Sequence, residues 1–194
     1  MTPTFTNQLI EADQQFFLWL NGLHSPFWDV VMQGVTNKFT WIPLYVLLLY
    51  GIIRQFGKKS VGYLLAIVAV VALSDQIASG FFKPYFMRPR PCHDPALADL
   101  LHLVGNCGGA YGFISSHAAT GFGIAIILNL LPLRQLLGVR WLFVWAAVYS
   151  YSRIYVGVHY PLDILGGALM GSLAAGVVYI VHKKTAGRLN SEYL

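Results

Sequence analysis

The chain has 194 residues, of which 56% are hydrophobic and only 11% charged, and its formal net charge is +5. A soluble domain usually carries about 25% charged residues, so most of this surface must face something other than water. The positive charge does not indicate a nucleic-acid partner, because the basic residues stand in ones and twos between apolar runs and form no basic stripe. The length and the lack of a low-complexity linker predict one domain, residues 1–194.

Residues 1–37 predict two helices that lie along a membrane surface. The first helix has apolar residues at helical spacing: Leu9, Phe16, Phe17 and Leu20. We expect these side chains to face the bilayer, opposite the acids Glu11 and Asp13. Because the first twenty residues hold these two acids and no Lys or Arg, the segment lacks the usual form of a secretory signal. The second helix is short and places Trp28 beside Asp29.

Five apolar stretches are candidates for crossing a bilayer, which takes about 20 apolar residues. In chain order they are residues 39–53, 61–78, 118–133, 139–151 and 161–181. The first and fourth are short, so their ends must extend into flanking polar residues. The sequence therefore predicts an all-α integral membrane bundle of about five transmembrane helices, with a core at 39–182 and a cytoplasmic tail at 183–194. The alternative is a soluble protein with a large buried helical core.

The basic residues predict the orientation, since Lys and Arg favour cytoplasmic loops. Three groups fall on one side of the five stretches: Arg54, Lys58 and Lys59; Arg134 and Arg140; and Lys183, Lys184 and Arg188. We therefore expect the C-terminus inside and the N-terminus outside. The outer side also holds positive charges, against the rule: Lys38, Lys83, Arg88, Arg90 and Arg153. A function at this face would explain them.

Three clusters of polar residues occur in or beside the two outer connections. The first is Lys83, then six residues, then Arg90-Pro91. The second is GFISSHAAT, and it carries Ser115, Ser116 and His117. The third is Ser152-Arg153, five residues, His159, three residues and Asp163. Their order and internal spacings form one composite pattern.

This pattern resembles the three-part signature of the type 2 phosphatidic acid phosphatase (PAP2) superfamily, KxxxxxxRP, PSGH and SRxxxxxHxxxD. The resemblance covers residues 83–163. It departs in the middle motif, where Ile114 and Ser116 stand in place of proline and glycine. Because Ser116 can still offer its backbone N–H to an oxyanion, we expect altered detail and not lost activity.

The cations of the pattern suit a phosphoryl group in transfer, which spreads negative charge over its equatorial oxygens. Arginine matches those oxygens with two parallel hydrogen bonds, and lysine adds a compact point charge. Lys83, Arg90 and Arg153 therefore predict a phosphate clamp. Backbone N–H groups near Ser115 and Ser116, at the start of a helix, would add donors.

The resemblance implies the remaining roles. His159 would attack phosphorus and form a phosphohistidine. Asp163, about one helical turn further on, would accept the other ring N–H of His159. His117 would protonate the leaving group and then activate water. Neither a metal nor another cofactor is expected, because three fixed cations already neutralise the charge.

Several alternatives remain open for the same residues. Arg153 and Asp163 could form a structural ion pair within the membrane. The clamp could also bind an anionic lipid without cleaving it, as in a transporter or lipid-binding protein, or hold vanadate as in a haloperoxidase of the same superfamily. Arg88 lies outside the matched pattern, and we expect it in solvent or among lipid headgroups.

Cys92 and Cys107 are the only two cysteines of the chain. Both fall in the first outer connection, so in an oxidising compartment they can form one disulfide. The alternative is a metal site completed by His93 and His102, although the spacing is not that of a familiar zinc site.

The resulting expectation is a membrane lipid phosphatase whose substrate keeps its tail in the bilayer. Candidate substrates within the superfamily are undecaprenyl diphosphate, phosphatidylglycerophosphate, phosphatidic acid, diacylglycerol diphosphate and lipid A phosphate. By analogy with the superfamily, a short chain with its site on the outer face suits a bacterial inner membrane, with the site facing the periplasm.

Overall fold

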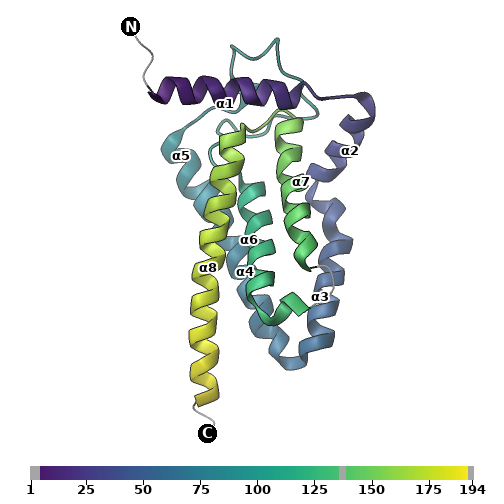
Figure 1. The fold of residues 1–194 in the computed structure, drawn as a ribbon, viewed down its shortest axis with the longest axis vertical. Coiled ribbons are helices and arrows are strands. Elements are labelled where there is room, and N and C mark those ends of the chain that lie inside the picture. Colours follow the sequence, from purple (N-terminus) through teal and green to yellow (C-terminus); the bar gives the residue numbers. More distant parts are fainter. Residues whose placement is uncertain (1–4, 136–138, 192–194) are drawn as a thin grey trace.

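The computed structural model describes residues 5–135 and 139–191, and the regular secondary structure of this part is helical (Figure 1). Within these ranges no strand forms, and a single isolated bridge pairs Pro89 with Tyr111. The predicted all-α class is confirmed for the described residues. The side chains of Arg134 and Arg188, and residues 192–194 of the predicted tail, lie outside the described part.

The α-helices are numbered in chain order as in Figure 1. They are α1 (Phe5–Asn21), α2 (Pro26–Thr36), α3 (Ile42–Phe56), α4 (Ser60–Asp75), α5 (Lys83–Phe86), α6 (Ser116–Leu130), α7 (Leu142–Tyr155) and α8 (Pro161–Ser191). A π-helical turn, Gln76–Phe82, joins α4 to α5 without a break. The helix expected to end near residue 78 thus continues to Phe86, and Lys83 lies on it.

Two apolar helical stretches are long enough to cross a membrane, Lys38–Phe86 and Pro161–Ala186, and Ser116–Leu130 is a shorter apolar helix. The first stretch is not a single rod. The chain reverses at Gly57, whose φ of 51° suits glycine, and α3 and α4 then run in opposite directions (Figure 1). The count of five spans stays a prediction.

Helix α6 occupies the middle of the bundle, where it packs against α4, α7 and α8. Two glycines of α8 make the closest approach possible. A Cβ atom at Gly167 would overlap the carbonyl oxygen of Ser115, and one at Gly171 would overlap that of Ala119. Small residues of this kind let helix backbones approach each other within a membrane.

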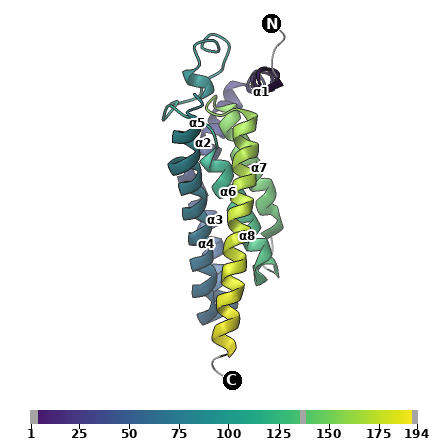
Figure 2. The same cartoon turned by 90° about the vertical axis from the view of Figure 1, so that its left-hand side faces the viewer.

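Helix α1 lies across the end of the bundle opposite the C-terminus, beside the long loop that follows α5 (Figures 1 and 2). Its buried residues are Asp13, Phe17 and Asn21, four residues apart. The prediction that Phe17 faces the bilayer opposite Asp13 was wrong, because both lie on the face packed against the bundle. Phe16 is exposed on the other side.

Candidate active site

The three polar clusters converge at the end of the bundle that α1 covers. Lys83 lies at the end of the long α4–α5 path, and Arg90 lies in the loop after it. Ser115 and His117 stand at the start of α6. Arg153 lies in the last turn of α7, while His159 and Asp163 lie in the short connection to α8 and in its first turn. The site is therefore built from helix ends and from the loops that join them.

His159 and Asp163 form a buried pair. The ring nitrogen Nδ1 of His159 lies 3.1 Å from Oδ2 of Asp163, and the side chains are 2% and 0% exposed. The same oxygen accepts the backbone N–H of Tyr160 at 3.0 Å, in the manner of an acidic residue that caps its own helix start. Because an ionised carboxylate only accepts hydrogen bonds, Nδ1 carries the proton and Nε2 is the acceptor nitrogen of the ring.

Positive charges lie around Nε2 of His159. Nη1 of Arg90 lies 3.5 Å from Nε2 of His159 and 3.4 Å from the carbonyl oxygen of Val158. Burial, and after it the charges of Arg90, Arg153 and two further cations, hold the pKa of His159 well below its ordinary value. The imidazole is therefore neutral at neutral pH, and its Nε2 lies among cations that would attract an anion.

Lys83 approaches the site from the other side. Its Nζ donates to Oγ of Ser116 at 3.0 Å, and that hydroxyl lies 2.9 Å from the hydroxyl of Ser79. Ser79 in turn donates to Oδ1 of Asp75 at 3.4 Å. The chain of bonds directs Lys83 toward the first turn of α6, whose leading N–H groups lack intrahelical partners.

Thr36, the last residue of α2, holds two of the predicted site residues. Nη1 of Arg153 donates to its Oγ1 at 2.6 Å, and Nε2 of His117 lies 3.3 Å from its carbonyl oxygen. The ring of His117 packs on that of Tyr149, with centroids 4.8 Å apart. Thr36 carries no signal in the sequence, because only the packing of α2 against α7 brings it here.

Ser115 does not reach the site in the way that we expected. It is fully buried, its N–H donates to the carbonyl oxygen of Asp163 at 2.9 Å, and its Oγ accepts the N–H of Ala118 at 3.4 Å. Its polar groups are thus used to cap α6 and to join α6 to α8. The donors left at this helix start are the N–H groups of Ser116 and His117.

The expectation for Arg88 was wrong. Its guanidinium bridges two carboxylates, with Nη1 3.0 Å from Oδ1 of Asp163 and Nη2 2.6 Å from Oδ2 of Asp13. It also lies over the ring of Tyr160, 4.1 Å from the centroid. Asp163 therefore pairs with Arg88, and the structural ion pair with Arg153 that was considered from the sequence does not form.

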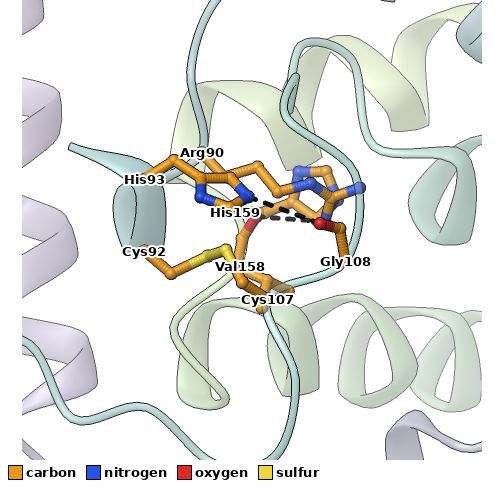
Figure 3. The surroundings of a disulfide bond; sticks show 7 residues. All are labelled: Arg90, Cys92, His93, Cys107, Gly108, Val158 and His159. Atoms are coloured by element: carbon orange, nitrogen blue, oxygen red, sulfur yellow. Dashed lines mark hydrogen bonds between the residues drawn. A yellow bond between two sulfur atoms is a disulfide. The ribbon is translucent and has the colours of Figure 1, made fainter.

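Cys92 and Cys107 are joined by a disulfide across a separation of fifteen residues (Figure 3). The bond lies next to Arg90 and His159, and Nε2 of His93 lies 3.3 Å from the carbonyl oxygen of Gly108 in the same loop. The alternative metal site is ruled out, because both sulfurs are bonded to each other. Among the described residues, no group of three or more His, Cys, Asp or Glu side chains could hold a metal ion.

A family model described as the PAP2 superfamily matches residues 61–186, a range that contains all three polar clusters. The chain belongs to this superfamily, as its motifs predicted. The curated relatives that match 79% or more of this chain are named phosphatases, and the chain is a lipid phosphatase of the membrane.

Two curated relatives show which phosphatase activities are named among similar proteins. The chain is 38% identical to the lipid A 4'-phosphatase of Bacteroides thetaiotaomicron, over 95% of this chain and 83% of that one. It is 29% identical to the undecaprenyl-diphosphatase of Sulfolobus acidocaldarius, over 79% of this chain and 66% of that one.

Two crystal structures are similar in fold. LpxE of Aquifex aeolicus has a TM-score of 0.61 and 26% identity, over 85% of this chain and 93% of that one. A transmembrane PAP2-type phosphatidylglycerolphosphate phosphatase from Bacillus subtilis has a TM-score of 0.68 and 23% identity, over 93% of this chain and 89% of that one.

Proposed function

We propose that this phosphatase hydrolyses a lipid phosphate through a phosphohistidine on His159. The observation that carries the proposal is the geometry of one imidazole. Asp163 holds its Nδ1 at 3.1 Å, and Arg90 lies 3.5 Å from its Nε2. An oriented, neutral imidazole whose unprotonated Nε2 lies beside a cation suits attack on a phosphorus atom that carries negative oxygens, once those oxygens take over the guanidinium.

The reaction proceeds in two steps. In the first, the Nε2 lone pair of His159 forms a bond to phosphorus, the bond from phosphorus to the lipid oxygen breaks, and His117 gives that oxygen a proton. In the second, water gives a proton to His117 and attacks phosphorus, and the phosphorus–nitrogen bond breaks. The products are the dephosphorylated lipid and inorganic phosphate.

The clamp stabilises the charge of both steps. Lys83, Arg90 and Arg153 come from three different elements and share one region, since all three charges act on His159. The N–H groups of Ser116 and His117 add donors at the positive end of α6. These fixed charges supply the electrostatic stabilisation, so we propose a reaction that needs no added metal.

We place the site at the outer, periplasmic face of a bacterial inner membrane. The α3–α4 turn with Lys58 and Lys59, and the C-terminal end of α8, lie at the end opposite α1 (Figure 1). Lys and Arg favour the cytoplasmic side, so that end is cytoplasmic. Five spans then follow, formed by α3, by α4 with α5, and by α6, α7 and α8.

The substrate tail has a place to bind. A cavity of about 420 Å³ lies between α3, α4, α6 and α7, and most of its lining is apolar. Thr120, Tyr149 and Lys38 are among the residues that line it. Tyr149 packs on His117, so the cavity begins directly below the proposed acid and base. We propose that one hydrocarbon chain of the substrate occupies it.

Among lipid phosphates, we propose a phosphomonoester of the lipid A 4'-phosphate type as the first candidate, because the relative of that name matches 95% of this chain. Undecaprenyl diphosphate is the second candidate, from the relative named for it. Phosphatidylglycerophosphate and phosphatidic acid complete the comparison set.

The test is a side-by-side assay of phosphate release from these lipids by the purified protein, with and without EDTA. We expect release in both conditions, fastest from the lipid A substrate, and none from the matched His159→Ala variant. Binding without release would support the alternative of a non-catalytic lipid binder or transporter. Loss of activity in EDTA that added metal restores would contradict the metal-free reaction.

A further inference from the structure

We propose that Arg88 and Asp13 are positioning residues of the active site, and that α1 is thereby part of the catalytic unit. Arg88 lies outside the three motifs, and Asp13 lies on a helix that precedes the bundle. The proposal rests on hydrolysis at His159 and concerns how the partner carboxylate, Asp163, is held.

Arg88 bridges the carboxylates of Asp163 and Asp13. One guanidinium joins the two carboxylates at 3.0 Å and 2.6 Å, and its side chain is 21% exposed, against 0% for Asp163 and 2% for Asp13. Buried carboxylates are stable only when a cation or several donors satisfy them. Arg88 supplies the cation for both carboxylates, so the loss of one contact affects the other.

The other carboxylate oxygen of Asp13 connects α1 to the start of α8. Oδ1 accepts the N–H of Leu162 at 2.9 Å, in the first turn of α8. A carboxylate at this place favours the helix start, where the helix dipole is positive. Burial raises the pKa of Asp13, while Arg88 and the Leu162 N–H oppose that shift. Helix α1 thus caps the helix that carries Asp163 and also fixes the cation that binds it.

The consequence for catalysis follows from the planarity of the carboxylate. Arg88 holds Oδ1 of Asp163, so Oδ2 is left pointing at His159, where it meets Nδ1 at 3.1 Å. Without Arg88 the carboxylate keeps only the N–H of Tyr160 and the imidazole as partners, both on Oδ2. Its orientation is then less fixed, and its control of the tautomer weakens. In metal enzymes, removing a comparable outer partner of a histidine costs about 10- to 100-fold in activity or metal affinity.

The experiment compares Arg88→Gln and Asp13→Asn with wild type, measuring kcat and KM on a short-chain lipid phosphate in detergent. The control is Glu11→Gln, which removes an exposed acid from the same helix. We expect kcat to fall about 10- to 100-fold in Arg88→Gln, with KM unchanged and the protein folded by size-exclusion chromatography. Arg88→Lys should recover part of kcat, because it keeps the charge but not the fork. The double variant should fall no further than Arg88→Gln alone, because the two residues act as a unit.

A folded Arg88→Gln with wild-type kcat would overturn the proposal, as would a loss confined to KM, which would make Arg88 a substrate-binding residue. Should Arg88→Gln fail to fold, Asp13→Asn decides: a folded protein with wild-type kcat excludes the coupling to α1. These outcomes presuppose an active wild type. A wild type that releases no phosphate from any lipid phosphate would instead remove the proposed function, and the positioning role with it.

Discussion

His159 and Asp163 lie four residues apart, and Nδ1 of the one meets Oδ2 of the other at 3.1 Å inside the protein. Asp163→Asn should keep the shape of this contact but not its control of the tautomer, because the amide can donate to Nδ1 as well as accept. In a Ser-His-Asp triad the same change lowers kcat about 10⁴-fold. We expect a loss of about 10²- to 10⁴-fold in kcat, measured as steady-state phosphate release. A variant within twofold of wild type would contradict the pairing role.

His159→Ala should abolish turnover, because it removes the proposed nucleophile. The matched control is His93→Ala, which removes an exposed histidine from the neighbouring loop. We expect less than about 10⁻³ of the wild-type rate in the first variant, as for the loss of a nucleophile, and near-normal rates in the second. Incubation with a ³²P-labelled substrate should label wild type on histidine. Turnover by folded His159→Ala would refute the assignment.

The lowered pKa of His159 predicts a stability that falls with acid. In the unfolded chain a histidine takes up a proton near pH 6.5, whereas the buried ring, next to four cations, takes it up only at much lower pH. Below pH 6.5 the unfolded state therefore binds more protons, and the free energy of unfolding drops by up to about 1.4 kcal/mol per pH unit. Thermal melts in detergent at pH 5 to 7.5 measure this. His159→Gln should show a shallower dependence, and an equal slope would refute the prediction.

The disulfide offers a test of orientation. A bond between Cys92 and Cys107 is stable only in an oxidising space, and it closes a fifteen-residue loop worth about 3 kcal/mol by the chain-entropy estimate. After mild reduction of intact cells, a membrane-impermeant maleimide should label these cysteines, with Cys92→Ser/Cys107→Ser as the unlabelled control. Labelling that appears only after lysis would reverse the proposed topology.

The cavity for the lipid tail predicts a selective effect of chain length. Val71→Trp should fill it from α4, while Val68→Trp adds the same bulk at an exposed position of the same helix that does not line the cavity. We expect KM for a long-chain substrate to rise about tenfold in the first variant, equivalent to about 1.4 kcal/mol, with little change for a short-chain substrate. Equal effects of both variants would exclude the cavity as the tail site.

The class of the protein could be predicted from the sequence, since the motifs indicated the PAP2 superfamily and the family model confirms it. Low charge and long apolar runs predicted helices, since a helix satisfies its own backbone hydrogen bonds in lipid. The spacing of four between His159 and Asp163 predicted their contact, because it spans about one helical turn. These features are local, so they can be read along the chain.

The contacts that depend on packing between distant segments are visible only in the tertiary structure. Asp13 was expected in water and is buried, because α1 lies across the bundle end and puts its acid on Arg88. Thr36 lies in the site because α2 packs against α7, and Ser115 does not, because the close contact of α6 with α8 uses its N–H. Apolar periodicity shows which face of a helix can be buried. Which charges meet there depends on how the helices cross, and no local pattern encodes that.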